Sequence, residues 1–113
     1  MSIQNPNLKE YDFLRGMYND GYFPDFLVDK IKTILIALCE EIGQVNPQSE
    51  AALLTITHAA TVQINALEGE FDENNSELET EAREVMGADF EYIVRTYGFA
   101  DVDIEDVIAP REW

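Results

Sequence analysis

Residues 24–43 read PDFLVDKIKTILIALCEEIG, and this stretch decides the fold class. Its apolar side chains recur every three or four residues, a spacing that places them on one face of an α-helix. A proline opens the stretch and a glycine closes it, as is typical of the two ends of a helix. The stretch therefore predicts a long core helix whose apolar face consists of Phe26, Leu27, Ile31, Ile34, Leu35, Leu38 and Ile42.

Two further helices are predicted next to this stretch. Residues 8–19 carry aromatic and aliphatic side chains at helical spacing, and Gly21 interrupts the chain soon afterwards. On the other side, Asn46 and Pro47 repeat a cap-then-proline signal and begin a helix that reaches about Phe71. Both flanking segments are therefore predicted to be helical.

The C-terminal part of the chain predicts one long helix and one short one. Ser76 and Glu79 have the spacing of a capping box, so a helix is expected from there to about Tyr97. A short turn over residues 103–109 stops at Pro110. No run alternates with the period of two that a strand requires. We therefore predict an all-α fold, a compact bundle of four helices plus a short C-terminal helix, formed as a single domain by residues 1–113.

The chain is strongly acidic. Its 113 residues include 23 Asp and Glu against 7 Lys and Arg, a formal net charge of −16 at pH 7. Nucleic acids and anionic membranes attract proteins through Lys and Arg, so the charge argues against either as a partner. The lone Cys39 and the polar N-terminal segment fit the cytoplasm better than export, and the longest uncharged stretch, residues 51–67, is short of a membrane span. We therefore predict a cytoplasmic protein in which Cys39 is a buried small hydrophobe.

The negative charge is concentrated between residues 68 and 106, where fourteen acidic residues face two arginines. Four of these acids, Glu77, Glu81, Glu84 and Glu91, share the solvated face of the helix predicted over residues 76–97. Glu68, Glu70 and Asp72 differ, because we expect them at the carboxyl end of the preceding helix, where acidic side chains oppose the helix dipole. Departures of this kind can mark a partner surface. The candidate contact surface consists of Glu68, Glu70, Asp72, Glu73 and Glu77.

The leading hypothesis is a non-enzymatic interaction protein, in the manner of acidic inhibitors or immunity proteins that meet a basic partner by electrostatic steering. The chain would act as a monomer, or as a homodimer through a face of the helix predicted over residues 47–71.

The alternative hypothesis is a small ligand-binding or enzymatic bundle that uses His58 and Asp89. His58, the single histidine, lies off the apolar stripe of its helix, beside Thr61 and Asn65. It is either a core residue with a hydrogen-bond partner or a general base or metal ligand. Asp89 lies in an apolar arc, so we expect it to be partly buried and bonded to His58, a tyrosine or an arginine.

No cofactor is expected. Di-iron bundles and histidine-rich zinc sites need more than one histidine, which excludes both. Asp101, Asp103, Glu105 and Glu112 match the first, third, fifth and twelfth positions of a calcium-binding loop, but Asp106 stands where the loop needs glycine. The simpler interpretation is that Asp103 caps a short helix.

Four segments resemble a small bacterial family of single-domain proteins of unknown function. They are residues 23–30 (FPDFLVDK), 57–61 (THAAT), 82–84 (ARE) together with 88–90 (ADF), and 108–113 (IAPREW). The resemblance runs nearly end to end and implies a bacterial source, but it carries no activity. It adds weight to His58, Asp89, Arg111 and Trp113 as positions of interest.

Overall fold

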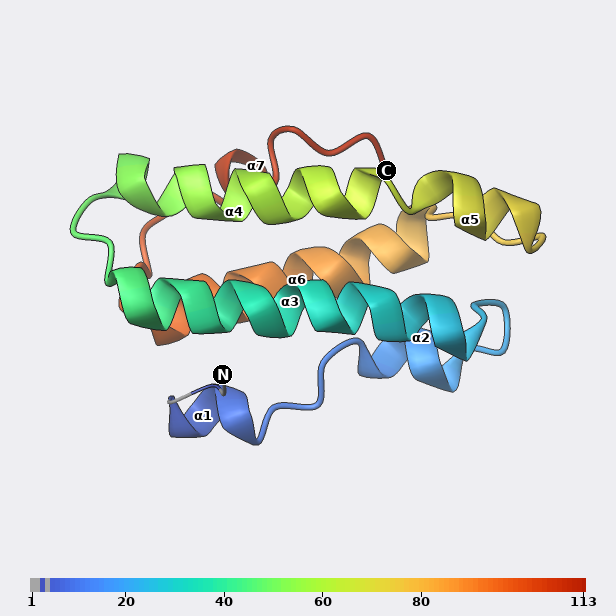
Figure 1. Ribbon diagram of the computed structural model, residues 1–113, viewed down its shortest axis with the longest axis horizontal. Coiled ribbons are helices and arrows are strands. Elements are labelled where there is room, and N and C mark those ends of the chain that lie inside the picture. The colour runs from blue at the N-terminus through green and yellow to red at the C-terminus, as the bar shows by residue number, and fades with distance from the viewer. Residues whose placement is uncertain (1–2, 4) are drawn as a thin grey trace.

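The computed structural model describes residue 3 and residues 5–113, and within that part of the chain it contains helices and no strand (Figure 1). The predicted all-α fold is confirmed. The helices are α1 (Pro6–Lys9), α2 (Arg15–Asn19), α3 (Asp25–Val45), α4 (Glu50–Asn65), α5 (Glu68–Glu73), α6 (Thr80–Thr96) and α7 (Ile104–Val107).

The helices α3 and α4 lie side by side and α6 crosses behind them (Figure 1). The short helices α1 and α2 contact α6 from one side, and α7 contacts both α6 and α4 from the other. The helix α5 extends beyond the end of α4 at one end of the long axis of the molecule (Figure 1). None of the described helices is both long and apolar enough to cross a membrane.

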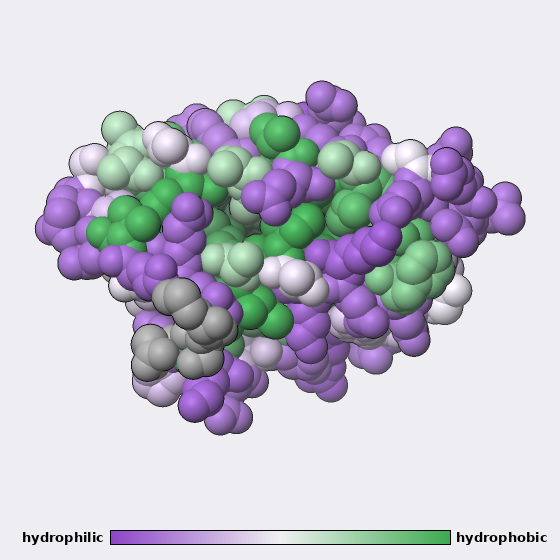
Figure 2. Space-filling view, in the orientation of Figure 1, coloured by the Kyte–Doolittle hydropathy of each residue, from purple (hydrophilic) through white to green (hydrophobic). Residues whose placement is uncertain are grey.

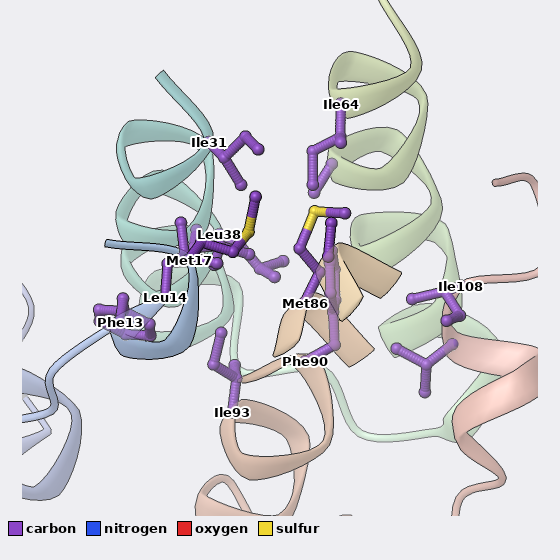
Figure 3. Close-up of a cluster of buried hydrophobic side chains, with 14 of the residues drawn as sticks. Phe13, Leu14, Met17, Ile31, Leu38, Ile64, Met86, Phe90, Ile93 and Ile108 are labelled. Atoms are coloured by element: carbon purple, nitrogen blue, oxygen red, sulfur yellow. The ribbon is translucent and has the colours of Figure 1, made fainter. Parts of the chain in front are cut away.

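The core is formed where α3, α4 and α6 meet the segment that contains α2. Ile31 and Leu38 come from α3, Ile64 comes from α4, and Met86 and Phe90 come from α6 (Figure 3). The helix predicted over residues 24–43 is present as α3 and buries most of its expected face, with residues such as Leu27, Leu35 and Ile42 at most 1% exposed. Phe26 is an exception, because 54% of it is exposed at the start of the helix.

The single helix predicted over residues 8–19 is wrong. The structure breaks it at Leu14, which precedes α2 with a left-handed φ of 61°. Phe13 and Leu14, at the break, are both buried. The Leu14 amide donates to Asp89 Oδ2 at 2.7 Å in place of a helical carbonyl, so a tertiary contact satisfies the backbone where the helix is interrupted.

The helix predicted from Asn46–Pro47 to Phe71 is also two helices. The α4 helix begins later, after Ser49, whose hydroxyl accepts a hydrogen bond from the Ala52 amide at 3.1 Å. It ends at Asn65, and α5 begins as a new helix at Glu68. The amides of residues 66 and 67 continue to bond to α4 carbonyls, so the two helices are joined by a tight turn.

The capping box predicted at Ser76 does not form. The α6 helix starts at Thr80, and its N-cap residue Glu79 makes no side-chain cap bond. Ser76 is instead buried in the loop between α5 and α6, where its amide donates to the Phe71 carbonyl at 2.9 Å. Its hydroxyl has no hydrogen-bond partner. The sequence pattern was therefore correct about the helix and wrong about the role of the serine.

Candidate functional site

Asp89 is buried on α6, with 4% of the residue exposed. Its Oδ1 accepts a hydrogen bond from the Tyr11 hydroxyl and its Oδ2 accepts one from the Leu14 amide, each at 2.7 Å. Burial raises the pKa of Asp89, and the bonds from Tyr11 and Leu14 oppose that rise. The expected bond between Asp89 and a tyrosine is confirmed, and the carboxylate holds the break before α2 in place.

His58 is half-buried on α4 and has a different partner. Its Nε2 lies 2.6 Å from the carbonyl oxygen of Asp106, which fixes α7 against α4. The histidine therefore bonds to the main chain, whereas Asp89 bonds to the segment before α2. Neither residue lines the pockets described below, and the structure does not join them as a pair.

Asn65, which shares the polar side of α4 with His58, holds the segment after α7. Its Nδ2 donates to the Pro110 carbonyl at 3.0 Å, and its Oδ1 accepts from the Glu112 amide at 2.9 Å. Asn65 thus bonds to a carbonyl and an amide of the same extended segment. The sequence showed this polar line on the helix, but it gave no reason to assign the C-terminal segment as its partner.

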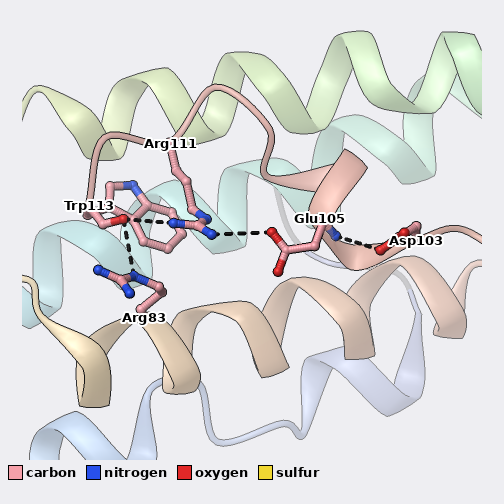
Figure 4. A network of polar contacts seen from close by, with 5 residues as sticks. All are labelled: Arg83, Asp103, Glu105, Arg111 and Trp113. Carbon is pink, nitrogen blue, oxygen red and sulfur yellow. Dashed lines mark hydrogen bonds and ion pairs between the residues drawn. The ribbon is translucent and has the colours of Figure 1, made fainter.

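Two arginines hold the main chain of Trp113 (Figure 4). The Trp113 carbonyl oxygen accepts hydrogen bonds from Arg83 Nε at 3.3 Å and from Arg111 Nη1 at 3.1 Å. Arg111 also forms an ion pair with Glu105 at 3.2 Å. Only 3% of Trp113 is exposed, so these positions, singled out by the family resemblance, serve the packing of the C-terminal segment.

The calcium loop considered at residues 101–112 is not supported. Asp103 caps α7 by accepting a hydrogen bond from the Glu105 amide at 2.9 Å, which confirms the simpler interpretation of this residue. Glu105 is occupied by Arg111. Within the described part of the chain, no group of three or more His, Cys, Asp or Glu residues is placed to hold a metal ion. Asp101 and Glu112 are among these described residues and belong to no such group.

A groove between α6 and α7 has a volume of about 320 Å³. It is lined by acidic and basic residues together, including Arg83, Glu84, Glu105 and Arg111. Both arginines donate to the Trp113 carbonyl and Arg111 also pairs with Glu105, so both cationic side chains of the groove are engaged within the chain.

Two of the three acidic residues expected at a helix carboxyl end lie instead at the start of a helix. Glu68 and Glu70 occupy the first turn of α5, where negative charge stabilises the helix dipole, so the expectation is wrong for these two. Asp72 lies in the last turn of α5, where negative charge opposes the dipole as expected. Among the described residues, Lys30 is the one cation that forms an ion pair with α5.

The acidic surface is only partly neutralised by the chain itself. Lys30 Nζ lies 2.7 Å from Glu70 Oε1, and this is the one ion pair that the described residues form with α5. Asp72, Glu73 and Glu77 are exposed, and hydrophilic residues cover the tip of the molecule at the end where α5 lies (Figure 2). We call Glu68, Glu70, Asp72, Glu73 and Glu77 together the α5 acidic surface.

A pocket of about 410 Å³ opens within this region, between α5 and the loop that leads to α6. Oε1 of Glu68 and Oγ of Ser76 are buried and have no hydrogen-bond partner. The pKa of Glu77 is raised, first by a side-chain hydrogen bond with Glu79 and then by the negative charge of Glu79. The pocket is therefore rich in acceptors and poor in donors. Its lining consists of Glu68, Gly69, Asp72, Ser76, Glu77, Leu78 and Glu79.

Cys39 lies apart from these sites, in the interior of α3. It is fully buried, and burial raises the pKa of its thiol to about 12. The thiol is therefore protonated and unreactive at neutral pH, as expected of a cysteine that acts as a small hydrophobe.

A model of the Family of unknown function (DUF5713) matches residues 7–113, nearly the whole chain. The resemblance to a small single-domain family of unknown function is confirmed by this match. No curated protein and no solved structure matches the chain.

Proposed function

We propose that this chain, which belongs to that family of unknown function, is an interaction module that binds a basic protein through the α5 acidic surface. The observation that carries the proposal is the imbalance of charge at one end of the molecule. Five acidic residues gather there, and the described part of the chain supplies them with one ion pair, Lys30–Glu70. A basic partner would provide the missing positive charge.

The position of the surface supports this role. Since α5 extends beyond the end of α4, its side chains can meet a partner without rearrangement of the core (Figure 1). The net charge of −16 would also accelerate the approach of a basic protein, and salt would weaken that effect. The net negative charge would thus attract a basic protein, and the α5 acidic surface would be accessible for it to bind.

The alternative, an enzyme or ligand-binding bundle that uses His58 and Asp89, has no comparable support. Each residue has a structural partner, the Asp106 carbonyl for His58 and Tyr11 with Leu14 for Asp89. His58 connects α4 to α7, whereas Asp89 connects α6 to the segment before α2. We therefore do not propose a catalytic role for either.

The test compares the protein with two variants that each lose four negative charges. The contact variant carries Glu68→Gln, Asp72→Asn, Glu73→Gln and Glu77→Gln, whereas the control variant carries Glu10→Gln, Glu41→Gln, Glu84→Gln and Asp101→Asn. Each protein is immobilised and exposed to an extract of the source cells at about 0.05 M and about 0.5 M NaCl. Bound proteins are identified, and the affinity of each is then measured with purified components.

The proposal expects a basic protein that binds the wild type and the control variant at low salt, dissociates at high salt and does not bind the contact variant. Equal binding by the contact and control variants would show that only net charge matters and would overturn the assignment of the surface. Failure of the wild type to bind any basic protein at low salt would overturn the proposed function itself.

A further inference from the structure

We propose that the pocket between α5 and the α5–α6 loop binds one arginine side chain of the partner. This inference rests on the proposed function and names the group that the α5 acidic surface would recognise. The pocket volume of about 410 Å³ lies in the range of small-molecule sites, which is ample for one side chain. The arginine would enter from solvent and place its guanidinium among the carboxylates of the lining.

Ser76 is the feature that distinguishes this pocket from an ordinary group of surface acids. The residue is 1% exposed, lines the pocket and has an unpartnered hydroxyl. A buried polar group without a partner destabilises a protein, and most such groups in native structures are satisfied. Glu68 adds a second unpartnered oxygen at the same place. A bound ligand that donates hydrogen bonds would satisfy both oxygens.

The chemistry of the lining selects a cationic donor. Glu68, Asp72, Glu77 and Glu79 all contribute carboxylates, so an anion or a simple acceptor would be repelled. A side-chain hydrogen bond with Glu79, followed by the negative charges of Glu79 and Asp72, already holds the pKa of Glu77 above its ordinary value. A positive charge placed among these groups would remove this repulsion.

A metal ion is a poorer candidate than an organic cation. The carboxylates that line the pocket are not placed as a metal-binding group, since the described residues form none. Calcium and magnesium need several oxygens at short, fixed distances, whereas a guanidinium carries five donors on a plane and can bond to separated acceptors.

Arginine also fits better than lysine. Guanidinium is more weakly hydrated than ammonium, so its transfer into a partly enclosed pocket is less costly. Leu78 adds an apolar wall against which the methylene groups of the arginine can lie. Arginine is also enriched among the residues that contribute most of the binding energy at protein interfaces.

The experiment titrates isotope-labelled protein with Nα-acetyl-L-arginine methylamide and follows the backbone amide signals by NMR. Gly69, Ser76 and Leu78 are the reporters, because all three residues line the pocket. The matched probes are the corresponding blocked lysine and blocked citrulline, which has the shape of arginine without the charge. The expected result is saturable shifts of these three amides, an affinity about fivefold higher for arginine than for lysine, and no saturation with citrulline.

Two variants locate the binding site. Glu68→Gln should weaken arginine binding about tenfold, the loss expected for one charge-assisted hydrogen bond. Ser76→Ala should weaken it severalfold and raise the melting temperature of the free protein, because it removes a buried unsatisfied hydroxyl. Asp72→Asn is a second charge variant on the exposed rim, in case Glu68→Gln perturbs α5. Glu41→Gln is the matched control, since it removes one exposed charge from α3, outside both the pocket and the α5 acidic surface, and should leave affinity unchanged within about twofold.

Equal binding of citrulline, or shifts spread over all acidic residues and insensitive to Glu68→Gln, would overturn the inference. The proposed function is judged separately by the contact variant. If that variant loses the basic partner while blocked arginine does not bind the pocket, the arginine site fails and the interaction surface stands. If the partner still binds the contact variant, the proposed function fails whatever the result with arginine.

Discussion

Asp89 connects α6 to a segment more than seventy positions earlier in the chain. Its two oxygens accept from the hydroxyl of Tyr11 and the amide of Leu14, which are separated by the buried ring of Phe13. The left-handed φ of Leu14 is unfavourable for a branched side chain, so the bond to its amide helps to compensate for that conformation. The sequence predicted that Asp89 would need a donor, but it could not identify which donors the tertiary fold brings to it.

Replacement of Tyr11 by Phe should destabilise the protein by about 1–3 kcal/mol at neutral pH, because it removes a hydrogen bond to a buried carboxylate. Tyr92→Phe is the control, since Tyr92 stacks on Tyr11 with ring centroids 4.3 Å apart but makes no described bond to Asp89. Urea unfolding of both variants measures the difference. Equal losses in the two variants would show that ring packing, and not the bond, is what matters.

The same variant has a predicted pH dependence. Burial raises the native pKa of Asp89 above its ordinary value of 3.8, so the contribution of this residue to stability is greatest below about pH 3.8 and declines as the pH rises through the native pKa. The bond from Tyr11 lowers that pKa, so Tyr11→Phe should raise it further. The destabilisation caused by Tyr11→Phe should therefore be larger at about pH 7 than at about pH 3, as unfolding at the two pH values would measure. A loss that grew towards low pH would contradict this assignment.

At the scale of the elements, the sequence predicts a helix well where the residues that begin and end it are neighbours in the chain. It does not predict helix ends that depend on contacts with distant residues. Periodicity and a terminal proline were enough to predict α3. The end of α4 carries no glycine or proline, and it is visible only as the short turn that precedes α5. The dipole argument that singles out the α5 acidic surface holds for Asp72 but not for Glu68 and Glu70, which start α5. The spacing of Ser76 and Glu79 predicts a helix cap, so it points away from the pocket that Ser76 lines.

Asn65 is predicted to hold the C-terminal segment on α4. Asn65→Ala removes both of its main-chain bonds and should lower stability by about 1–3 kcal/mol. Trp113 is the single tryptophan and is 3% exposed, so its fluorescence reports on the segment directly. The variant should emit at longer wavelength and be quenched more strongly by acrylamide.

Gln63→Ala is the matched control for this experiment, because Gln63 is exposed on the same helix. Its fluorescence should equal that of the wild type. If Asn65→Ala also retained the wild-type emission and quenching, the two arginines on Trp113 would suffice to hold the segment, and the role assigned to Asn65 would be wrong.

At the scale of the whole molecule, the net charge of −16 opposes folding through self-repulsion. The ion pairs among the described residues do not offset it, because most of their side chains are largely exposed and such pairs contribute little. The acidity therefore has a cost in stability. Net charge of this size also keeps a protein soluble, and under the proposed function it would attract a basic partner.

Added salt should accordingly stabilise the free protein. The molecule measures 41 × 27 × 22 Å, so at about 0.01 M ionic strength, where the screening length is about 30 Å, its charges repel one another across most of the structure. At about 0.1 M the screening length is about 10 Å and only near neighbours interact. The melting temperature, measured by circular dichroism in NaCl, should rise over this range, by about 4–8 °C for each 1 kcal/mol gained. The contact variant, whose charge is −12 after four neutralisations, should begin at a higher melting temperature and gain less from salt. A melting temperature that fell with salt would show that favourable ion pairs outweigh repulsion. The net negative charge would then not destabilise the folded protein.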